Sequence, residues 1–183
     1  MIRTILSVLF AIGTAQSAHA ATLRVPQDHQ TIQAAIDSSN AGDTILVASG
    51  KYQERIHLKP EIIIRSDGDD AQGTDGMKRA EETIIDGGKA GKQPGVTMAE
   101  GSTLDGFTIT NVGAYDDALW RKHFDSHGEE LGDEEGSVQA EGTTPAISIR
   151  GVSCTVAHCI VHHNGDVGIG ILGMKDALFT PKL

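Results

Sequence analysis

Short runs of apolar residues recur along most of the chain, separated by turns rich in glycine, asparagine and aspartate. Within a run, apolar and polar positions alternate, as Phe107 and Ile109 alternate with Thr108 and Thr110. The runs are TILV at 44–47, RIHL at 55–58, IIIR at 62–65, TII at 83–85, GFTIT at 106–110, AISI at 146–149 and GIGI at 168–171. A period of two predicts β-strands that turn one face toward a core, so we expect a protein built mainly from short strands.

One segment near the N-terminus has a helical pattern instead. In QTIQAAIDSS, Ile32, Ala35 and Ile36 fall on one face of a predicted helix, and polar residues fall on the other. The following NAGD at 40–43 is predicted to end this helix with glycine and to begin the first strand. A helix placed before an array of strands is expected to cover the open end of their apolar interior.

Two strand-rich regions are versions of one unit. STLDGFTITNVG at 102–113 aligns with CTVAHCIVHHNG at 154–165, 52 residues further on. A polar stretch of 30 residues at 114–143 lies between them, and subtracting it leaves an interval of 22. The matched apolar pairs are Leu104 with Val156, Phe107 with Cys159 and Ile109 with Val161.

The same interval of 22 separates Ile63 from Ile85, Ile85 from Phe107, and Ile147 from Ile169. A short constant interval that holds two or three strands predicts a parallel β-helix, in which each coil lies on the one before it. An antiparallel sandwich also uses short strands and frequent turns, but it gives no reason for a constant interval. We therefore expect an all-β chain, a parallel β-helix with about 22 residues per coil and an N-terminal capping helix.

The first 20 residues are predicted to be a signal peptide. Arg3 precedes the apolar run ILSVLFAI at 5–12, and AHA at 18–20 is a small-residue cleavage site. The run is too short to span a bilayer comfortably, which argues against an uncleaved anchor, and no later segment is apolar enough to cross one. We expect a secreted or periplasmic protein whose single β-helix domain covers 21–183.

Charge and composition narrow the choice of partner. The chain has 15 Lys and Arg against 25 Asp and Glu, which gives a formal net charge of −10 at pH 7. No basic stripe is present to neutralise phosphates, so no nucleic-acid partner is expected. The acidity suits cation binding or solubility outside the cytoplasm, and the 22 glycines suit repeated tight turns.

The segment TIQAAIDSSNAGDTILVASGKYQERIHLKP at 31–60 resembles the N-terminal part of secreted right-handed parallel β-helix proteins of the pectin-lyase-like superfamily. In that superfamily a TIQ-A-I helix, a GDT strand and a G-x-Y-x-E turn recur. LDGFTITN at 104–111 and CIVHHNGDVGIGI at 159–171 are similar to its repeats, so the resemblance covers most of Leu23 to Leu172. It implies a right-handed β-helix.

This superfamily includes pectate lyases, polygalacturonases, pectin methylesterases and many bacterial surface or periplasmic proteins without a known reaction. The resemblance implies an acidic extracellular polysaccharide as ligand and, if the protein is an enzyme, a polysaccharide lyase or glycoside hydrolase. The G-N-x-D-F-I-F-G stretch of the methylesterases has no counterpart here, and the calcium-ligand and arginine motifs of the pectate lyases have none either. No catalytic residue is therefore carried over.

Two alternatives remain for the function. The protein can be a non-catalytic surface or periplasmic interaction module, or it can be a fragment of a longer β-helix protein. The second is suggested by MKDALFTPKL at 174–183, which neither completes a coil nor forms a clear cap. The sequence does not fix the oligomeric state.

The insertion at 114–143 is the best local candidate for ligand contact, because a regular solenoid does not need such a loop for its own stability. Aromatic rings stack on sugars, and a guanidinium group pairs with a uronate carboxylate. The residues that we predict to contact a polysaccharide are Tyr115, Asp116, Asp117, Trp120 and Arg121.

Calcium is the cofactor that the same insertion would suit, with Asp116, Asp117 and Asp125 as candidate oxygen ligands. The alternative reading is a solvated acidic loop, HGEELGDEEG at 127–136, beside a short helix. In that reading Leu119, Trp120 and His123 of the helix pack on the coil below.

A second cluster contains residues typical of Zn²⁺ or Cu²⁺ sites: Cys154, His158, Cys159, His162 and His163. Strand geometry argues against one shared ion, because four strand residues separate His158 from His162 by about 13 Å. We expect these residues to stack between coils, with Cys159 as a small buried thiol. A disulfide between the two cysteines would need a turn between them.

Several aspartates are predicted to have structural roles. Asp86 and Asp105 each precede a glycine, where an aspartate side chain commonly bonds to nearby backbone. The loop at 65–76 carries Asp67 and two further aspartates, Asp69 and Asp70, and could bind a cation. As a polar, turn-rich loop it is expected to be solvated instead.

Overall fold

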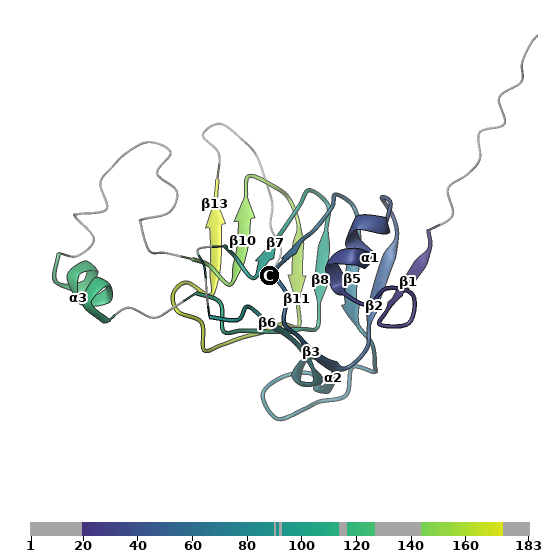
Figure 1. Ribbon diagram of the computed structural model, residues 1–183, viewed down its shortest axis with the longest axis horizontal. Coiled ribbons are helices and arrows are strands. Elements are labelled where there is room, and N and C mark those ends of the chain that lie inside the picture. The colour runs from purple at the N-terminus through teal and green to yellow at the C-terminus, as the bar shows by residue number, and fades with distance from the viewer. Residues whose placement is uncertain (1–19, 90, 92, 114–116, 127–143, 174–183) are drawn as a thin grey trace, which may run out of the picture.

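The computed structural model describes residues 20–89, 91, 93–113, 117–126 and 144–173, and its strands form three parallel sheets (Figure 1). Sheet A contains β1 (Thr22–Val25), β2 (Thr44–Val47), β5 (Ile63–Ser66), β8 (Thr103–Asp105) and β11 (Thr155–Ala157). Sheet B contains β3 (Gly50–Tyr52), β6 (Thr83–Asp86), β9 (Thr108–Thr110) and β12 (Ile160–Val161). Sheet C contains β4 (Ile56–His57), β7 (Val96–Thr97), β10 (Ile147–Arg150) and β13 (Ile169–Leu172).

After β1 the chain visits sheets A, B and C in a fixed rotation, and each strand pairs in parallel with its counterparts in the neighbouring coils. Three parallel sheets joined in this way make a parallel β-helix, which confirms the fold expected from the sequence. Each of the seven predicted runs overlaps a strand.

The core is made of apolar columns that run through the coils. Ile64, Leu104, Ile109 and Ile147 have no exposed surface, and burial of such a side chain contributes about 1.5–3 kcal/mol. The columns are Leu23, Ile45, Ile64, Leu104 and Val156 in sheet A; Tyr52, Ile85, Ile109 and Val161 in sheet B; and Ile56, Val96, Ile147 and Ile169 in sheet C.

The length of the coils varies more than the sequence predicted. The 52-residue alignment is confirmed, because Leu104 pairs with Val156 and Ile109 pairs with Val161. The interval of 22 between Ile147 and Ile169 is also a coil step. Along sheet A the steps are 22 (Thr22 to Thr44), 19 (Thr44 to Ile63), 40 (Ile63 to Thr103) and 52 (Thr103 to Thr155).

Two of the intervals counted in the sequence are not coil steps. Ile63 lies in sheet A, whereas Ile85 lies in sheet B and pairs with Ile109. The spacing of 22 between Ile63, Ile85 and Phe107 is therefore a coincidence. It arises because the loop between β5 and β6 lengthens the coil that contains it.

Helix α1 (Ile32–Ser38) is the predicted cap. Ile32, Ala35 and Ile36 are fully buried, and the helix contacts β1, β2 and β4, so it covers the interior beside sheets A and C. Two details differ from the prediction. β1 precedes the helix, and the helix ends at Ser39, whose backbone N–H and hydroxyl both donate to the Ile36 carbonyl.

The residues of the G-x-Y-x-E turn fasten this cap to the first coil. The Glu54 carboxylate accepts hydrogen bonds from the backbone N–H groups of Ile32 and Gln33, each at 3.0 Å. The side-chain oxygen of Gln33 accepts the N–H of His57 at 2.8 Å, and the hydroxyl of Thr31 accepts the N–H of Ala34 at 3.1 Å. The helix N-terminus thus finds partners for its free donors on β3 and β4.

The aspartate of the GDT strand has a similar role. Asp43 accepts the backbone N–H groups of Asn40 and Ala21, at 2.8 and 2.7 Å. These bonds, first from Asn40 and then from Ala21, hold the pKa of Asp43 below its usual value. The residues that carry the family resemblance therefore stabilise the start of the β-helix.

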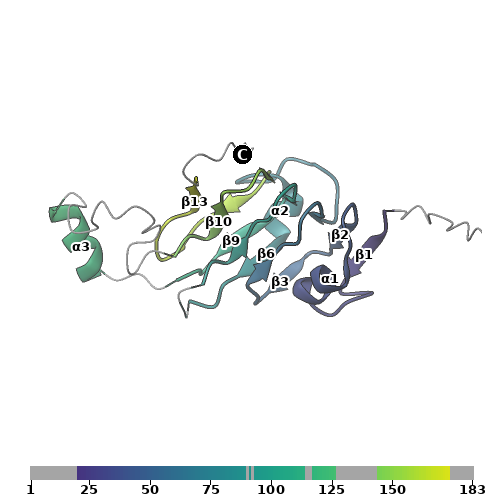
Figure 2. The same cartoon turned by 90° about the horizontal axis from the view of Figure 1, so that it is seen from above.

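Helix α2 (Lys78–Glu82) was not predicted, and it packs on the outer face of sheet B against β6 and β9 (Figure 2). The hydroxyl of Thr108 donates to the carbonyl of Ala80 at 2.8 Å. Thr108 faces outward, as its place in the alternation predicts, yet it is buried because α2 covers it. The loop at 67–77 and this helix account for the long step between β5 and β8.

A buried arginine attaches α2 to the corner after sheet A. The Arg79 side chain is 2% exposed and donates to the carboxylates of Asp70 and Asp105, at 2.6 and 2.8 Å. It also donates to the Ser66 hydroxyl at 2.9 Å. A buried charge is stable only when it is paired and hydrogen-bonded, and here it is. A Cβ atom on Gly106 would lie 1.6 Å from an Arg79 nitrogen, so only glycine admits the guanidinium.

We expect Glu54→Ala to lower the free energy of unfolding by about 1–2 kcal/mol, because two N–H groups at the start of α1 lose their acceptor. Urea denaturation followed by circular dichroism measures the change. Glu82→Ala is the control, since Glu82 is exposed and forms only an i,i+4 pair with Lys78, and it should stay within about 0.5 kcal/mol of wild type. Equal stability of the two variants would show that Glu54 does not support the cap.

We expect Gly106→Ala to lower the free energy of unfolding by about 3 kcal/mol or more, from the left-handed backbone and the clash with Arg79 together. Gly42→Ala is the matched control. Gly42 has a similar φ, +89° against +81°, but its Cβ would meet no atom within 4 Å, so it should show only the backbone contribution of about 1–2 kcal/mol. If both glycines cost the same, the Arg79 contact adds nothing.

Candidate functional site

The insertion is described only in part. Tyr115 and Asp116 lie outside the described residues, whereas Asp117, Trp120 and Arg121 belong to α3 (Asp117–Asp125). Arg121 donates to the Asp117 carboxylate at 3.3 Å, and both side chains are largely exposed. Pairs of this kind at i and i+4 contribute little to stability. Contact between these residues and a polysaccharide remains a prediction.

The candidate calcium ligands do not gather in the part of the insertion that is described. Asp117 and Asp125 stand eight residues apart, at the two ends of α3, which is about 12 Å along a helix axis. One ion cannot take both carboxylates in this arrangement. In the ranges that the structure describes, no three His, Cys, Asp or Glu side chains come together as a metal site.

The cysteines are free thiols, so the disulfide alternative is wrong. Cys159 packs against the core, and burial raises its pKa to about 11; burial also raises the pKa of Cys154. Thiols of this kind are poor nucleophiles at neutral pH. Nearby, Nδ1 of His158 lies 2.7 Å from the Asp105 carboxylate, which places His158 in the cluster around Arg79.

The aspartates of the loop at 65–76 are used within the protein. Asp67 accepts the N–H of Gly68, and Asp69 accepts the N–H of Ala71, as in ordinary turns. The hydrogen bond from Arg79 holds the pKa of Asp70 below its usual value. These carboxylates stabilise the loop and its attachment.

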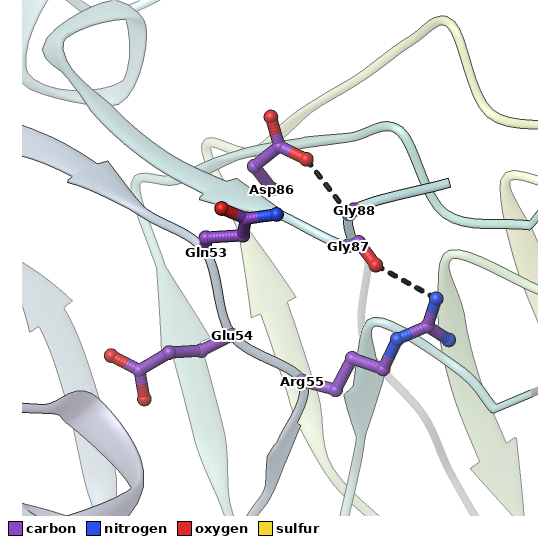
Figure 3. Close-up of a pocket in the computed structure, with 6 residues that line it drawn as sticks. All are labelled: Gln53, Glu54, Arg55, Asp86, Gly87 and Gly88. Atoms are coloured by element: carbon purple, nitrogen blue, oxygen red, sulfur yellow. Dashed lines mark hydrogen bonds between the residues drawn. The ribbon is translucent and has the colours of Figure 1, made fainter. Parts of the chain in front are cut away.

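An open cleft of about 390 Å³ lies where β3 and β6 end and the chain turns toward sheet C (Figure 3). Its position at a corner of the β-helix results from the parallel pairing of Tyr52 with Ile85, which brings the residues after the two strands side by side. The lining residues are Gln53, Glu54, Arg55, Asp86, Gly87 and Gly88.

Both carboxylates of the cleft are bound within the protein. Glu54 points away from the glycines (Figure 3) and bonds to the start of α1. Asp86 accepts the N–H of Gly88 at 2.8 Å and the amide of Asn111 at 2.9 Å, and it lies 2.5 Å from the Lys51 ammonium. Burial raises the pKa of Asp86, but the bonds from Lys51, Asn111 and Gly88 outweigh it, so that the pKa is below its usual value.

The groups that the cleft presents to solvent are different. Gln53 is exposed, and the Lys51 side chain at the edge of the cleft is 60% exposed. Arg55 donates to the carbonyls of Gly87, at 2.7 Å, and of Gln93, which joins the two sides of the cleft. An amide, an ammonium group and bare backbone are thus available to a ligand.

The cleft continues along the same corner of the β-helix. Extending the registers of sheet B by one residue aligns Gln53, Asp86, Thr110 and His162 in one outward-facing row. Adjacent strands are spaced about 4.8 Å apart, so this row is about 14 Å long. We call the polar residues here the sheet B corner: Gln53, Asp86, Asn111, His162 and His163.

Sequence reasoning did not find the cleft. The two halves of the cleft were recognised only as the G-x-Y-x-E turn at 50–54 and as a turn before glycine at Asp86. Their proximity depends on the register between β3 and β6, which are 33 residues apart. An interval of 22 pairs the wrong residues, and no other signal in the sequence gives this register.

Comparison with known proteins adds no assignment. Within the described part of the chain, no helix has the length and apolar character needed to cross a membrane. No protein-family model matches the sequence, and neither a curated protein nor a solved structure matches it.

Proposed function

We propose that the protein is secreted or periplasmic and binds an extracellular polysaccharide, preferably an acidic one. The observation that carries the proposal is the open polar cleft, which continues along the sheet B corner. The resemblance of residues 31–60 to the pectin-lyase-like superfamily and the signal-peptide pattern of the first 20 residues support it. Membership of that superfamily is part of the proposal.

The shape and chemistry of the cleft favour a sugar polymer over a small apolar ligand. The cleft is open, and its lining offers hydrogen-bonding groups without an aromatic or aliphatic floor. Small-molecule pockets are usually enclosed and mainly apolar. A row that repeats at the coil spacing would contact successive units of a chain lying across the coils.

The charges favour an anionic sugar. Glu54 and Asp86 are already bound within the protein, whereas Lys51 remains largely exposed beside Asp86. Lys89, also exposed, follows the cleft residue Gly88. On a chain of net charge −10, this is a local group of cations that a uronate carboxylate could meet.

Binding is favoured over hydrolysis. A glycoside hydrolase needs a carboxylic acid with a raised pKa to protonate the leaving group. Among the described carboxyl groups with a resolved shift, every pKa is lowered. These groups are carboxylates at neutral pH and are unsuited to act as the acid.

The residues predicted in the insertion, Tyr115, Asp116, Asp117, Trp120 and Arg121, belong to the proposal as a second contact region, with Ca²⁺ as a bridging ion. Trp120 is the only tryptophan of the chain. Its fluorescence therefore reports directly whether a polysaccharide reaches the insertion, and titration with and without Ca²⁺ shows whether the ion is required.

We expect the protein to bind polygalacturonate more tightly than the neutral polymer dextran, in an affinity electrophoresis or calorimetric assay. Lys51→Gln should weaken binding roughly five-fold, since one exposed charge contact contributes about 1 kcal/mol. Gln53→Ala should weaken binding to both polymers. Lys78→Gln is the matched control, because the Lys78 side chain is 61% exposed on α2, away from the cleft residues.

Three results would contradict the proposal. The folded protein could bind none of the polymers, which would favour the interaction module. Lys51→Gln could behave like Lys78→Gln, which would remove the cleft from the site. Reducing ends could be released from polygalacturonate, which would show hydrolysis and require a general acid.

A further inference from the structure

Two adjacent histidines at the far end of the sheet B corner face each other through the same ring atom. Nδ1 of His162 lies 2.5 Å from Nδ1 of His163. The ring centroids are 4.8 Å apart, and the ring planes are nearly perpendicular, at 87°. Both residues are exposed to solvent. Perpendicular rings direct their two in-plane lone pairs toward one point.

The backbone beneath these rings is held in place by the coil below. The N–H of His162 donates to the Ile109 carbonyl, and the His163 carbonyl accepts the N–H of Asn111. The next residue, Asn164, bonds to the same coil through both ends of its amide, to the Ile109 carbonyl and the Val112 N–H. The two imidazoles therefore project from a fixed corner, which lowers the entropy lost when both bind one ligand.

An ordinary hydrogen bond is one explanation of the contact. It requires one ring to carry its proton on Nδ1 and the other to carry it on Nε2. The alternative is that both Nδ1 atoms are unprotonated and share a cation. Zn–N bonds of about 2.0–2.1 Å at angles of 90–110° place two nitrogens about 2.9–3.4 Å apart, so the rings would move apart by less than about 1 Å.

We propose that His162 and His163 bind one divalent transition-metal cation through their Nδ1 atoms. Neutral imidazole suits Cu²⁺, Ni²⁺ and Zn²⁺, whereas Ca²⁺ prefers oxygen ligands. With two protein ligands, the remaining positions on the ion belong to water or to a polar group of a bound molecule. This site differs from the one considered in the sequence, which spread over His158 and the cysteines, and it does not depend on polysaccharide binding.

Titration with Cu²⁺ tests the site on the protein purified without a histidine tag. Isothermal calorimetry measures the affinity, and electron paramagnetic resonance of the bound ion reports its nitrogen ligands. The test variants take the residues that occupy the equivalent corner one coil below, where Thr110 and Asn111 stand. They are His162→Thr and His163→Asn. Asparagine tolerates the left-handed backbone of His163, whose φ is +51°.

Two controls match these variants. His57→Thr changes an exposed histidine on β4, and His158→Asn changes an exposed histidine with a similar φ of +53°. We expect one Cu²⁺ with two imidazole nitrogens in wild type and in both controls. We expect at least a ten-fold loss of affinity in each test variant, and no heat from Ca²⁺ at that site.

Other outcomes overturn the proposal. Unchanged Cu²⁺ affinity in His162→Thr and His163→Asn leaves the hydrogen bond as the explanation of the contact. A loss in only one of the two assigns the ion to a single histidine. An equal loss in the controls places it elsewhere. Circular dichroism of each variant separates loss of the site from loss of the fold, and a misfolded variant is replaced by His162→Gln or His163→Gln.

Discussion

The structure depends on backbone hydrogen bonding between neighbouring coils. In a parallel β-helix, the N–H and C=O groups of a strand find their partners on the equivalent strands of the coils before and after it. A shift of one residue would turn every inward side chain outward. The register therefore fixes the apolar columns, such as the one through Ile45, Ile64 and Leu104. The cap and α2 are attached to this frame by polar groups, through Glu54 and Arg79.

The corners between sheets obey a different constraint. Asn111, His158 and His163 all have left-handed backbone, with φ of +56°, +53° and +51°. For residues other than glycine this conformation costs about 1–2 kcal/mol each. Such residues persist because the adjacent coil holds the backbone, as it does for Asn111 and His163. The result is that polar side chains project from fixed positions, and two of these three belong to the sheet B corner.

Sequence reasoning could predict features set by local pattern. The alternation in GFTIT predicted the buried positions of Phe107 and Ile109, and the helical spacing of Ile32 and Ile36 predicted the cap. The alignment over 52 residues succeeded because both segments are the same part of a coil. Helix α2 was missed because five residues with no long apolar period give little signal. The cleft was missed because loops of unequal length decide which coil positions become neighbours.

The unequal coil steps also bear on how the chain becomes ordered. Closing a loop reduces chain entropy by an amount that grows as the logarithm of its length. The steps along sheet A rise from 19 residues, at Thr44 to Ile63, to 52, at Thr103 to Thr155. Closing the longest therefore costs about 0.9 kcal/mol more than closing the shortest. The β-helix is thus cheapest to begin at its N-terminal coils, where the cap already offers a surface on which the following turns can assemble in order.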